Sequence, residues 1–243
     1  PIESLFLSLT ILTICPLRGN PTVPENDKRI EVRNAEQTLP DLQQFKRIWK
    51  DVPKANGKCP WPERRPRDNH KEFKWDAVRF ANKVYAVFEM ARDTETDILV
   101  WMDADTVVHS PVTYGEFRLL VPATQWLHYL GRNKKWPECG WYGLTLRTEG
   151  ANAFLKEFQR VYDEAEQGIF LMEEWHDSFV FGSILNAMKD YYPEVLDYSA
   201  EMYLKEAKTG GGGHPLINGV LGTWLDHMKG VRKNEGKSRI YLD

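Results

Sequence analysis

The chain has 243 residues, of which 42% are hydrophobic and 12% aromatic, enough for a sizeable core. Its 32 basic and 35 acidic residues give a formal net charge of −3 and are scattered along the sequence, which excludes a basic block for binding nucleic acid. Three widely separated cysteines without C-x-x-C spacing predict neither a disulfide framework nor a zinc site, and they favour a reducing, cytoplasmic setting.

An apolar run at residues 5–15 is the one segment that resembles a membrane or export signal. It is shorter than the roughly 20 residues that span a bilayer, and it lacks the basic residues that usually precede a signal-peptide core. We therefore predict a buried strand or helix there and no transmembrane segment, with a cleaved or truncated leader as the alternative. Because the chain begins at Pro1 without a methionine, a segment missing upstream is left open, and the domain assignment of residues 1–35 is left open with it.

Residues 16–72 are rich in proline and in charge clusters, which predicts loops around short elements, with one helix at 39–49. From residue 73 to residue 91, apolar side chains recur at three- and four-residue steps, the pattern of an amphipathic helix that packs against a sheet. Residues 97–102 then bring an apolar run without alternation, which favours a central strand covered on both faces.

Further elements are predicted in the second half of the chain. A strand at 140–147 precedes an amphipathic helix at 154–165 that Gly168 stops, and another helix begins at Asp177. Four glycines at 210–213 predict a mobile lid or a surface linker, and a last helical pattern covers 221–228. The alternation predicts an α/β fold in a single domain over residues 1–243, with a central, mostly parallel mixed sheet flanked by helices.

Asp103 and Asp105 stand directly after the predicted strand at 97–102, at its carboxyl end. In open α/β sheets, ligands bind at this edge. Two carboxylates one residue apart can turn toward one point and bind a hard divalent cation through oxygen, and such an ion would neutralise a diphosphate. The alternative is that one aspartate caps a turn while the other faces water.

A second group of candidate residues lies more than a hundred positions later, at His227, Gly230 and Lys233. A neutral imidazole can complete the coordination of a metal, a glycine lets the backbone approach a phosphate, and a lysine supplies positive charge to a departing diphosphate. The alternative is a helix C-terminus, where these residue types are favoured for capping and dipole reasons.

Together, the apolar strand ending in Asp103-Ala104-Asp105 and the H-x-x-G-x-x-K tail resemble metal-dependent glycosyltransferases of the GT-A fold, which is Rossmann-like. The tail is most similar to that of the glycogenin-like and lipopolysaccharide galactosyltransferase families. The resemblance covers about residues 73 to 236. It implies that Asp103, Asp105 and His227 bind Mn²⁺ or Mg²⁺. It also implies that Gly230 and Lys233, with Asp103, lie at the diphosphate of a UDP- or GDP-sugar donor.

The same resemblance indicates an acidic residue at the head of a helix that activates the acceptor hydroxyl as a base or contacts the donor sugar. Asp177 is the candidate and Glu174 the reserve, and a plain helix N-cap is the alternative for Asp177. His176, which lies between them, is a candidate for acceptor or sugar contact.

Two further pairs are candidates for ligand contact. Trp141 and Tyr142 could stack on a sugar ring, with core packing as the alternative. Arg79 and Lys83 share a helix face and resemble basic residues that some GT-A enzymes aim at the nucleotide, with a solvated face as the alternative.

The preferred hypothesis is a glycosyltransferase that moves a sugar from a nucleotide-sugar donor to a carbohydrate or other hydroxyl acceptor. One rival is a phosphatase of the haloacid dehalogenase type, in which Asp103 would be the nucleophile and Asp105 would protonate the leaving group. Another rival is a non-catalytic carbohydrate-binding protein, since nine tryptophans suit contact with sugars. The tail at His227 would have no role in the phosphatase, and the intact ligand residues argue against a protein that has lost its activity.

Overall fold

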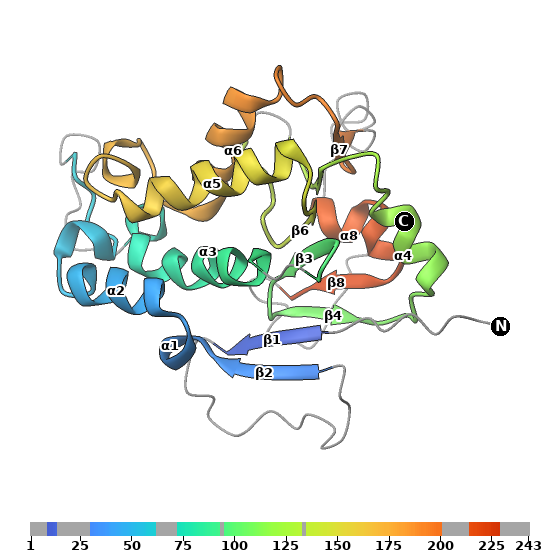
Figure 1. The fold of residues 1–243 in the computed structure, drawn as a ribbon, viewed down its shortest axis with the longest axis horizontal. Helices are drawn as coiled ribbons and strands as arrows, with labels where there is room; N and C mark the ends of the chain where they lie inside the picture. Colours follow the sequence, from blue (N-terminus) through green and yellow to red (C-terminus); the bar gives the residue numbers. More distant parts are fainter. Residues whose placement is uncertain are drawn as a thin grey trace. The chain divides into compact units, whose positions relative to one another are not determined.

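The computed structural model describes residues 9–13, 30–61, 72–92, 95–132, 135–200 and 214–228. Helices and strands follow one another through these ranges, which confirms the α/β class (Figure 1). The chain divides into two compact units: Pro1–Arg92 with Gln159–His176 form the first, and Asp93–Phe158 with Asp177–Asp243 form the second. The single domain expected over residues 1–243 stays a prediction. Within the ranges described, no helix is both long and apolar enough to cross a membrane.

The first unit contains a parallel pair of strands and several helices. Strand β1 pairs with β2, and Leu9 lies opposite Ile30, so the described part of the apolar run at 5–15 is a strand. The elements are β1 (Leu9–Thr13), β2 (Ile30–Asn34), α1 (Ala35–Thr38), α2 (Pro40–Trp49), η1 (Pro53–Asn56), η3 (Phe73–Trp75), α3 (Ala77–Ala91) and η4 (Ile169–Leu171). The helices expected at 39–49 and 73–91 are therefore confirmed as α2 and α3, the latter preceded by a 3-10 turn.

Aromatic packing holds the helices of the first unit together. The Phe45 ring of α2 lies 5.7 Å from the Tyr85 ring of α3 and 6.0 Å from the Tyr162 ring. The Tyr85 hydroxyl donates a hydrogen bond of 2.8 Å to Asp163. Burial and this neighbouring carboxylate raise the pKa of Tyr85, so the side chain stays neutral and remains a donor.

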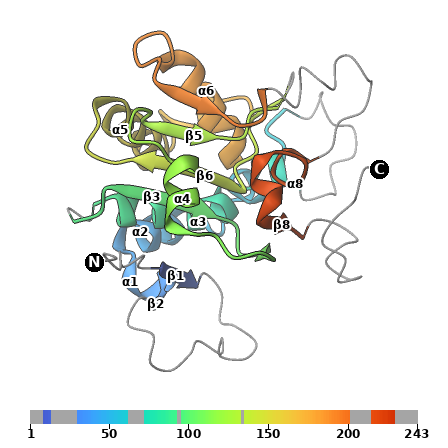
Figure 2. The same cartoon turned by 90° about the vertical axis from the view of Figure 1, so that its right-hand side faces the viewer.

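A four-stranded sheet forms the centre of the second unit, in the order β3-β6-β5-β7. Its strands β3, β6 and β5 are labelled in Figure 2. Its strands are β3 (Ile98–Met102), β6 (Trp141–Thr145), β5 (Leu127–Tyr129) and β7 (Val195–Asp197). The mixed sheet is confirmed, but parallel pairing is limited in it to β5 with β7, since β6 runs antiparallel to both β3 and β5. Within this sheet β3 is an edge strand and all its residues are half-buried, so the central, fully covered position predicted for 97–102 is wrong.

Helices and turns complete the second unit: α4 (Tyr114–Leu120), α5 (Glu149–Asp163), α6 (Asp177–Met188), α8 (Pro215–Asn218) and η5 (Val220–Thr223). Helix α5 contributes its residues up to Phe158 to this unit and the remainder to the first. The predicted helices at 154–165 and from Asp177 are thus confirmed as α5 and α6.

Side chains alternate across β6, so its two faces pack into two different clusters. Trp141 joins an apolar cluster that includes Leu120, Leu216 and Leu225, while the neighbouring Tyr142 lies 5.1 Å from the Phe181 ring of α6. The sheet is therefore flanked by helical elements on both faces, as expected for an α/β fold.

A histidine lies inside this apolar framework. His128 of β5 has no exposed surface. Burial lowers the pKa of His128 to about 4, because removing an imidazolium from water is unfavourable. His128 is therefore a neutral core residue at physiological pH.

A second, two-stranded sheet pairs β4 (Thr106–Val108) with β8 (Leu225–His227) in antiparallel register, with Thr106 opposite His227. The helix predicted over 221–228 is wrong, because the 3-10 turn η5 is followed by this strand. The apolar pattern there is too short for periodicity to distinguish helix from strand, and the ladder with β4 decides the conformation.

Candidate metal centre

Asp103 and Asp105 lie on the turn that joins β3 to β4. The Asp103 amide donates to the Gly140 carbonyl at 2.9 Å, which extends the pairing with β6 by one residue. The chain then turns, and the Thr106 amide donates back to the Asp103 carbonyl at 3.0 Å. In a continuous strand, residues 103 and 105 would share one face. Because the chain leaves the pleat here, the turn sets the directions of their side chains instead.

His227, which lies more than a hundred residues later in the second unit, contacts this turn. The backbone of β8 runs alongside β4, and the Met228 amide donates to the Asp105 carbonyl at 2.8 Å. The His227 Nε2 atom lies 2.8 Å from Asp105 Oδ1 and 3.7 Å from Asp103 Oδ2. The β4–β8 ladder therefore brings His227 to two aspartates that lie more than a hundred positions earlier in the sequence.

These three residues fit a divalent cation. One ligand atom from each, two carboxylate oxygens and one imidazole nitrogen, lie within 4.8 Å of one another. The set suits Mn²⁺, because carboxylates match hard cations and an imidazole nitrogen is accepted by first-row metals. His227 is fully buried, whereas the Asp103 and Asp105 side chains are 28% and 29% exposed, so the carboxylate side is open to solvent.

Trp101 orients one of the carboxylates. Its Nε1 donates a hydrogen bond of 2.8 Å to Asp103 Oδ1, while Asp103 Oδ2 is the oxygen nearer His227. Outer hydrogen bonds of this kind fix the rotamer of a ligating carboxylate. Trp101 is a positioning residue that the sequence analysis did not identify.

The backbone of Gly140 leaves room for His227. A Cβ at this position would lie 2.6 Å from His227 Cε1, 2.8 Å from its Nδ1 and 2.9 Å from Glu138 Oε1. We expect Gly140→Ala to displace the imidazole and weaken Mn²⁺ binding by at least about tenfold, as the loss of outer-shell support does in other sites. Calorimetric titration with Mn²⁺ measures this loss.

Gly115→Ala is the matched control, since a Cβ at Gly115 of α4 meets nothing within 4 Å. It should leave Mn²⁺ affinity unchanged and stabilise the helix by up to about 1 kcal/mol. Unchanged Mn²⁺ affinity in Gly140→Ala would show that His227 is not held where the geometry places it.

Two neighbouring residues were missed by sequence reasoning. Glu138 and His214 lie close to His227 and form with it a second set of possible ligands. Glu138 precedes the Cys139-Gly140 pair and His214 follows the four glycines, but as single residues they carry no spacing signal.

Three further candidates of the second unit are buried. Asp177 opens α6 with 6% of its surface exposed, and its Oδ1 accepts a hydrogen bond of 2.8 Å from the Ser178 amide. Trp141 and Tyr142 are 3% and 2% exposed and pack against Tyr198 and Phe181. The structure thus supports core packing for these two rings, and the contact of Trp141 and Tyr142 with a sugar stays a prediction.

Other candidates belong to the first unit. Glu174 forms an ion pair of 2.6 Å with Lys74 and lies 2.8 Å from His176 Nε2. His176 itself packs between the Phe73 and Phe80 rings, at 5.4 and 6.0 Å. These contacts hold Glu174 and His176 in a local polar and aromatic network.

Arg79 and Lys83 lie on α3 of the same unit. The Arg79 amide donates to Asp76, which caps the helix, and the guanidinium lies 5.7 Å from the Phe80 ring. Contact of either side chain with a nucleotide stays a prediction. Gly230, Lys233 and the glycines at 210–213 lie outside the described residues.

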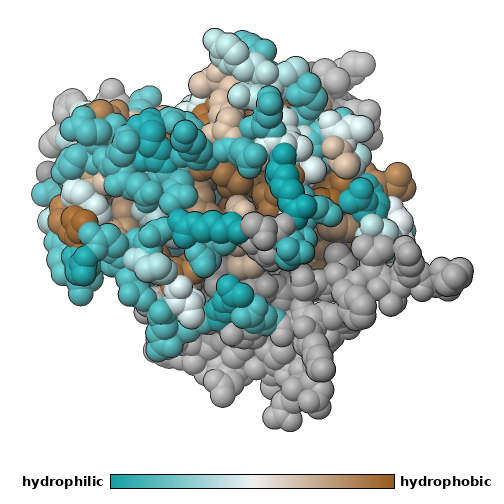
Figure 3. Space-filling model, viewed as in Figure 1, coloured by the Kyte–Doolittle hydropathy of each residue, from teal (hydrophilic) through white to brown (hydrophobic). Residues whose placement is uncertain are grey.

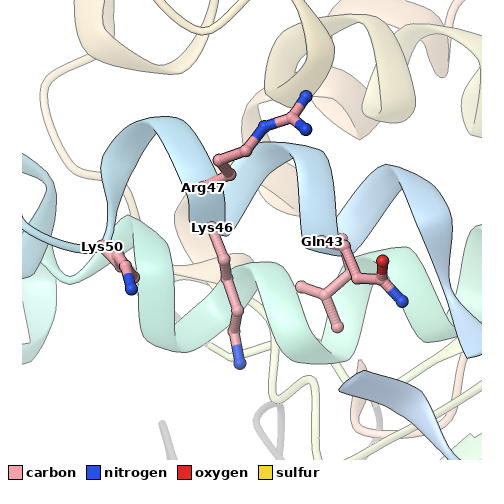
Figure 4. Close-up of a pocket in the computed structure, with 5 residues that line it drawn as sticks. Gln43, Lys46, Arg47 and Lys50 are labelled. Atoms are coloured by element: carbon pink, nitrogen blue, oxygen red, sulfur yellow. The ribbon is translucent and has the colours of Figure 1, made fainter. Parts of the chain in front are cut away.

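A hollow in the first unit offers no competing site. It has a volume of about 340 Å³ and is lined by Leu42, Gln43, Lys46 and Arg47 of α2 and by Lys50, the residue that follows it. The side chains of Arg47 and Lys46 point in opposite directions, so they do not converge on a ligand (Figure 4). On the face seen in Figure 3, hydrophilic residues predominate and hydrophobic ones lie in separate patches.

Comparison with known proteins gives no relative from which a function could be transferred. No family model, no curated protein and no solved structure matches the chain. The fold and the site define an α/β protein with a candidate divalent-metal centre, and any functional conclusion depends on that centre.

Proposed function

We propose that the protein is a metal-dependent glycosyltransferase that moves a sugar from a UDP- or GDP-sugar to an acceptor hydroxyl. One observation carries the proposal: Asp103, Asp105 and His227 converge at one point whose carboxylate side is open to solvent. A divalent ion bound there would neutralise the charge that develops on a departing nucleoside diphosphate. The resemblance in sequence adds Gly230 and Lys233 to the same diphosphate.

In this proposal, metal binding and proton transfer are assigned to different residues. Asp103 and Asp105 would present oxygen ligands, and the buried His227 would present Nε2, which lies 2.8 Å from Asp105 Oδ1. Asp177 is the candidate for accepting the proton of the acceptor hydroxyl as the new glycosidic bond forms. The separated cysteines, of which Cys59 and Cys139 are not in disulfides, support a reducing, cytoplasmic compartment for this activity.

The rival phosphatase reading is less well supported by the geometry. A nucleophilic Asp103 would need one oxygen aligned toward a phosphorus atom. Instead, Oδ1 accepts the Trp101 indole hydrogen bond and Oδ2 lies 3.7 Å from His227. That arrangement suits a fixed ligand better than an attacking group.

Calorimetric titration with UDP and GDP, with and without Mn²⁺, tests the proposal. We expect one nucleotide to bind at least about tenfold more tightly with Mn²⁺, because the ion bridges the diphosphate to the aspartates. Absence of metal-dependent binding to either nucleotide would contradict the transferase. Trapping of Asp103 with beryllofluoride would support the phosphatase, and binding of sugars without donor hydrolysis would indicate a carbohydrate-binding protein.

A further inference from the structure

The imidazole of His227 has a second group of potential ligands, formed by Glu138 and His214. His214 Nε2 lies 3.1 Å from Glu138 Oε2, and the rings of His214 and His227 are 5.1 Å apart at 87°. One ligand atom from each of the three residues lies within 4.8 Å of the others. All three belong to the second unit, as do Asp103 and Asp105.

The surrounding chain holds Glu138 in a defined position. Its amide donates to the Leu130 carbonyl at 2.7 Å, and its Oε1 accepts from the Gly140 amide at 3.1 Å. Its Oε2 forms an ion pair with Arg132. The Glu138 side chain is 4% exposed and that of His214 14%, so the group is largely removed from water. A carboxylate has about four lone-pair sites, which leaves capacity for a metal beside these donors.

We propose that Glu138, His214 and His227 form a binding site for Zn²⁺ or a chemically similar transition metal, distinct from the site at Asp103 and Asp105. Two imidazoles with one carboxylate are a donor set that zinc takes in proteins, with a further position left for water. Mg²⁺ and Mn²⁺ prefer oxygen-rich surroundings, which the two aspartates provide. This inference rests on the donor set and not on the proposed transferase activity.

His227 is common to both sites, and this makes them mutually exclusive. A neutral imidazole offers one nitrogen lone pair and carries a proton on the other nitrogen. Nε2 faces Asp105, whereas Nδ1 lies on the side of Gly140 and Glu138. When Zn²⁺ takes Nδ1, the proton stays on Nε2 and is donated to Asp105 at 2.8 Å, the carboxylate–histidine–metal arrangement. Zinc therefore competes with Mn²⁺ for the same imidazole, and the other ligands of the two ions differ.

The double variant Asp103→Asn/Asp105→Asn isolates the new site, because asparagine still accepts the Nε2 proton. Titration of this full-length variant with Zn²⁺ should still show binding, weakened by about 10-fold to 100-fold because the neutral amide is a poorer outer-shell acceptor than the carboxylate. Adding His214→Gln should weaken Zn²⁺ binding by about 100-fold or more, since a ligand matters at least as much as its outer-shell support. His109→Gln is the control, because the exposed His109 bonds Ser110 and the Gly222 carbonyl instead.

Loss of Zn²⁺ binding in the aspartate variant, or its retention after His214→Gln, would overturn the inference. If the His214 variant fails to fold by circular dichroism, the visible spectrum of Co²⁺ bound to the aspartate variant decides. Strong four-coordinate bands support the site, and weak six-coordinate bands contradict it. In the wild type, Mn²⁺ should raise the apparent dissociation constant for Zn²⁺, whereas independent binding of both ions would contradict mutual exclusion. Neither result depends on whether UDP or GDP binds.

Discussion

Replacing Asp105 by asparagine should reduce metal-dependent hydrolysis of the donor sugar by about 10³-fold at Mn²⁺ concentrations that saturate the wild type, because the variant loses most of the bound ion, which contributes several kcal/mol of charge stabilisation to the transition state. Asp105 supplies an oxygen to the cluster, accepts from His227 at 2.8 Å and bonds Met228 through its carbonyl. Asparagine keeps the size and the hydrogen bond but removes the negative charge. Rates measured over a range of Mn²⁺ concentrations separate weakened metal binding from slower chemistry.

Asp190→Asn is the matched control, since Asp190 is exposed in the turn after α6 and belongs to the same unit. It should leave both the rate and the Mn²⁺ affinity unchanged. If Asp105→Asn retains full activity at low Mn²⁺, the metal centre lies elsewhere. If Asp105→Asn weakens Mn²⁺ binding but even the wild type hydrolyses no nucleotide sugar, the result supports the metal centre and contradicts the transferase.

Phe181→Ala should lower the free energy of unfolding by about 3–5 kcal/mol, the range for deleting a buried phenylalanine ring. Phe181 of α6 is 1% exposed and packs against the Phe154 ring at 4.9 Å and the Tyr142 ring at 5.1 Å. Removing it takes away contacts that join α5 and α6 to β6 and leaves a cavity among rigid rings. Urea unfolding followed by circular dichroism measures the loss.

Leu119→Ala provides the comparison, because Leu119 of α4 is 79% exposed and its truncation removes little buried area. Its effect should stay within about 0.5 kcal/mol. A loss of less than about 1 kcal/mol in Phe181→Ala would mean that this cluster repacks around the missing ring, contrary to the tight ring contacts.

Local patterns were sufficient for the long helices and for the two aspartates. The periodicity of α2, α3, α5 and α6 lies within each segment, and the apolar run of β3 points directly at Asp103 and Asp105. The edge position of β3 could not be predicted in this way, because it depends on which strands pair with it. A sequence pattern indicates burial and periodicity, but it does not identify the segments that pack against the element.

The rest of the site depends on contacts between distant segments. His227 was selected through a resemblance in spacing, while the strand that carries it was mistaken for a helix, since only the ladder with β4 makes it extended. The fold brings Glu138 and His214 to His227, and the spacing of these residues in the sequence does not predict that they meet. Trp141 and Tyr142 were considered for sugar contact. Because side chains alternate between the faces of β6, each ring packs into an apolar cluster on its own side of the sheet.

The uneven burial of the ligands has a kinetic consequence. Asp103 and Asp105 are more than a quarter exposed, whereas His227 is enclosed. If Mn²⁺ binds here, we expect an ion arriving from solvent to meet the carboxylates first and to exchange its last waters for the imidazole afterwards. The aspartates would then govern the association rate, and the histidine the dissociation rate.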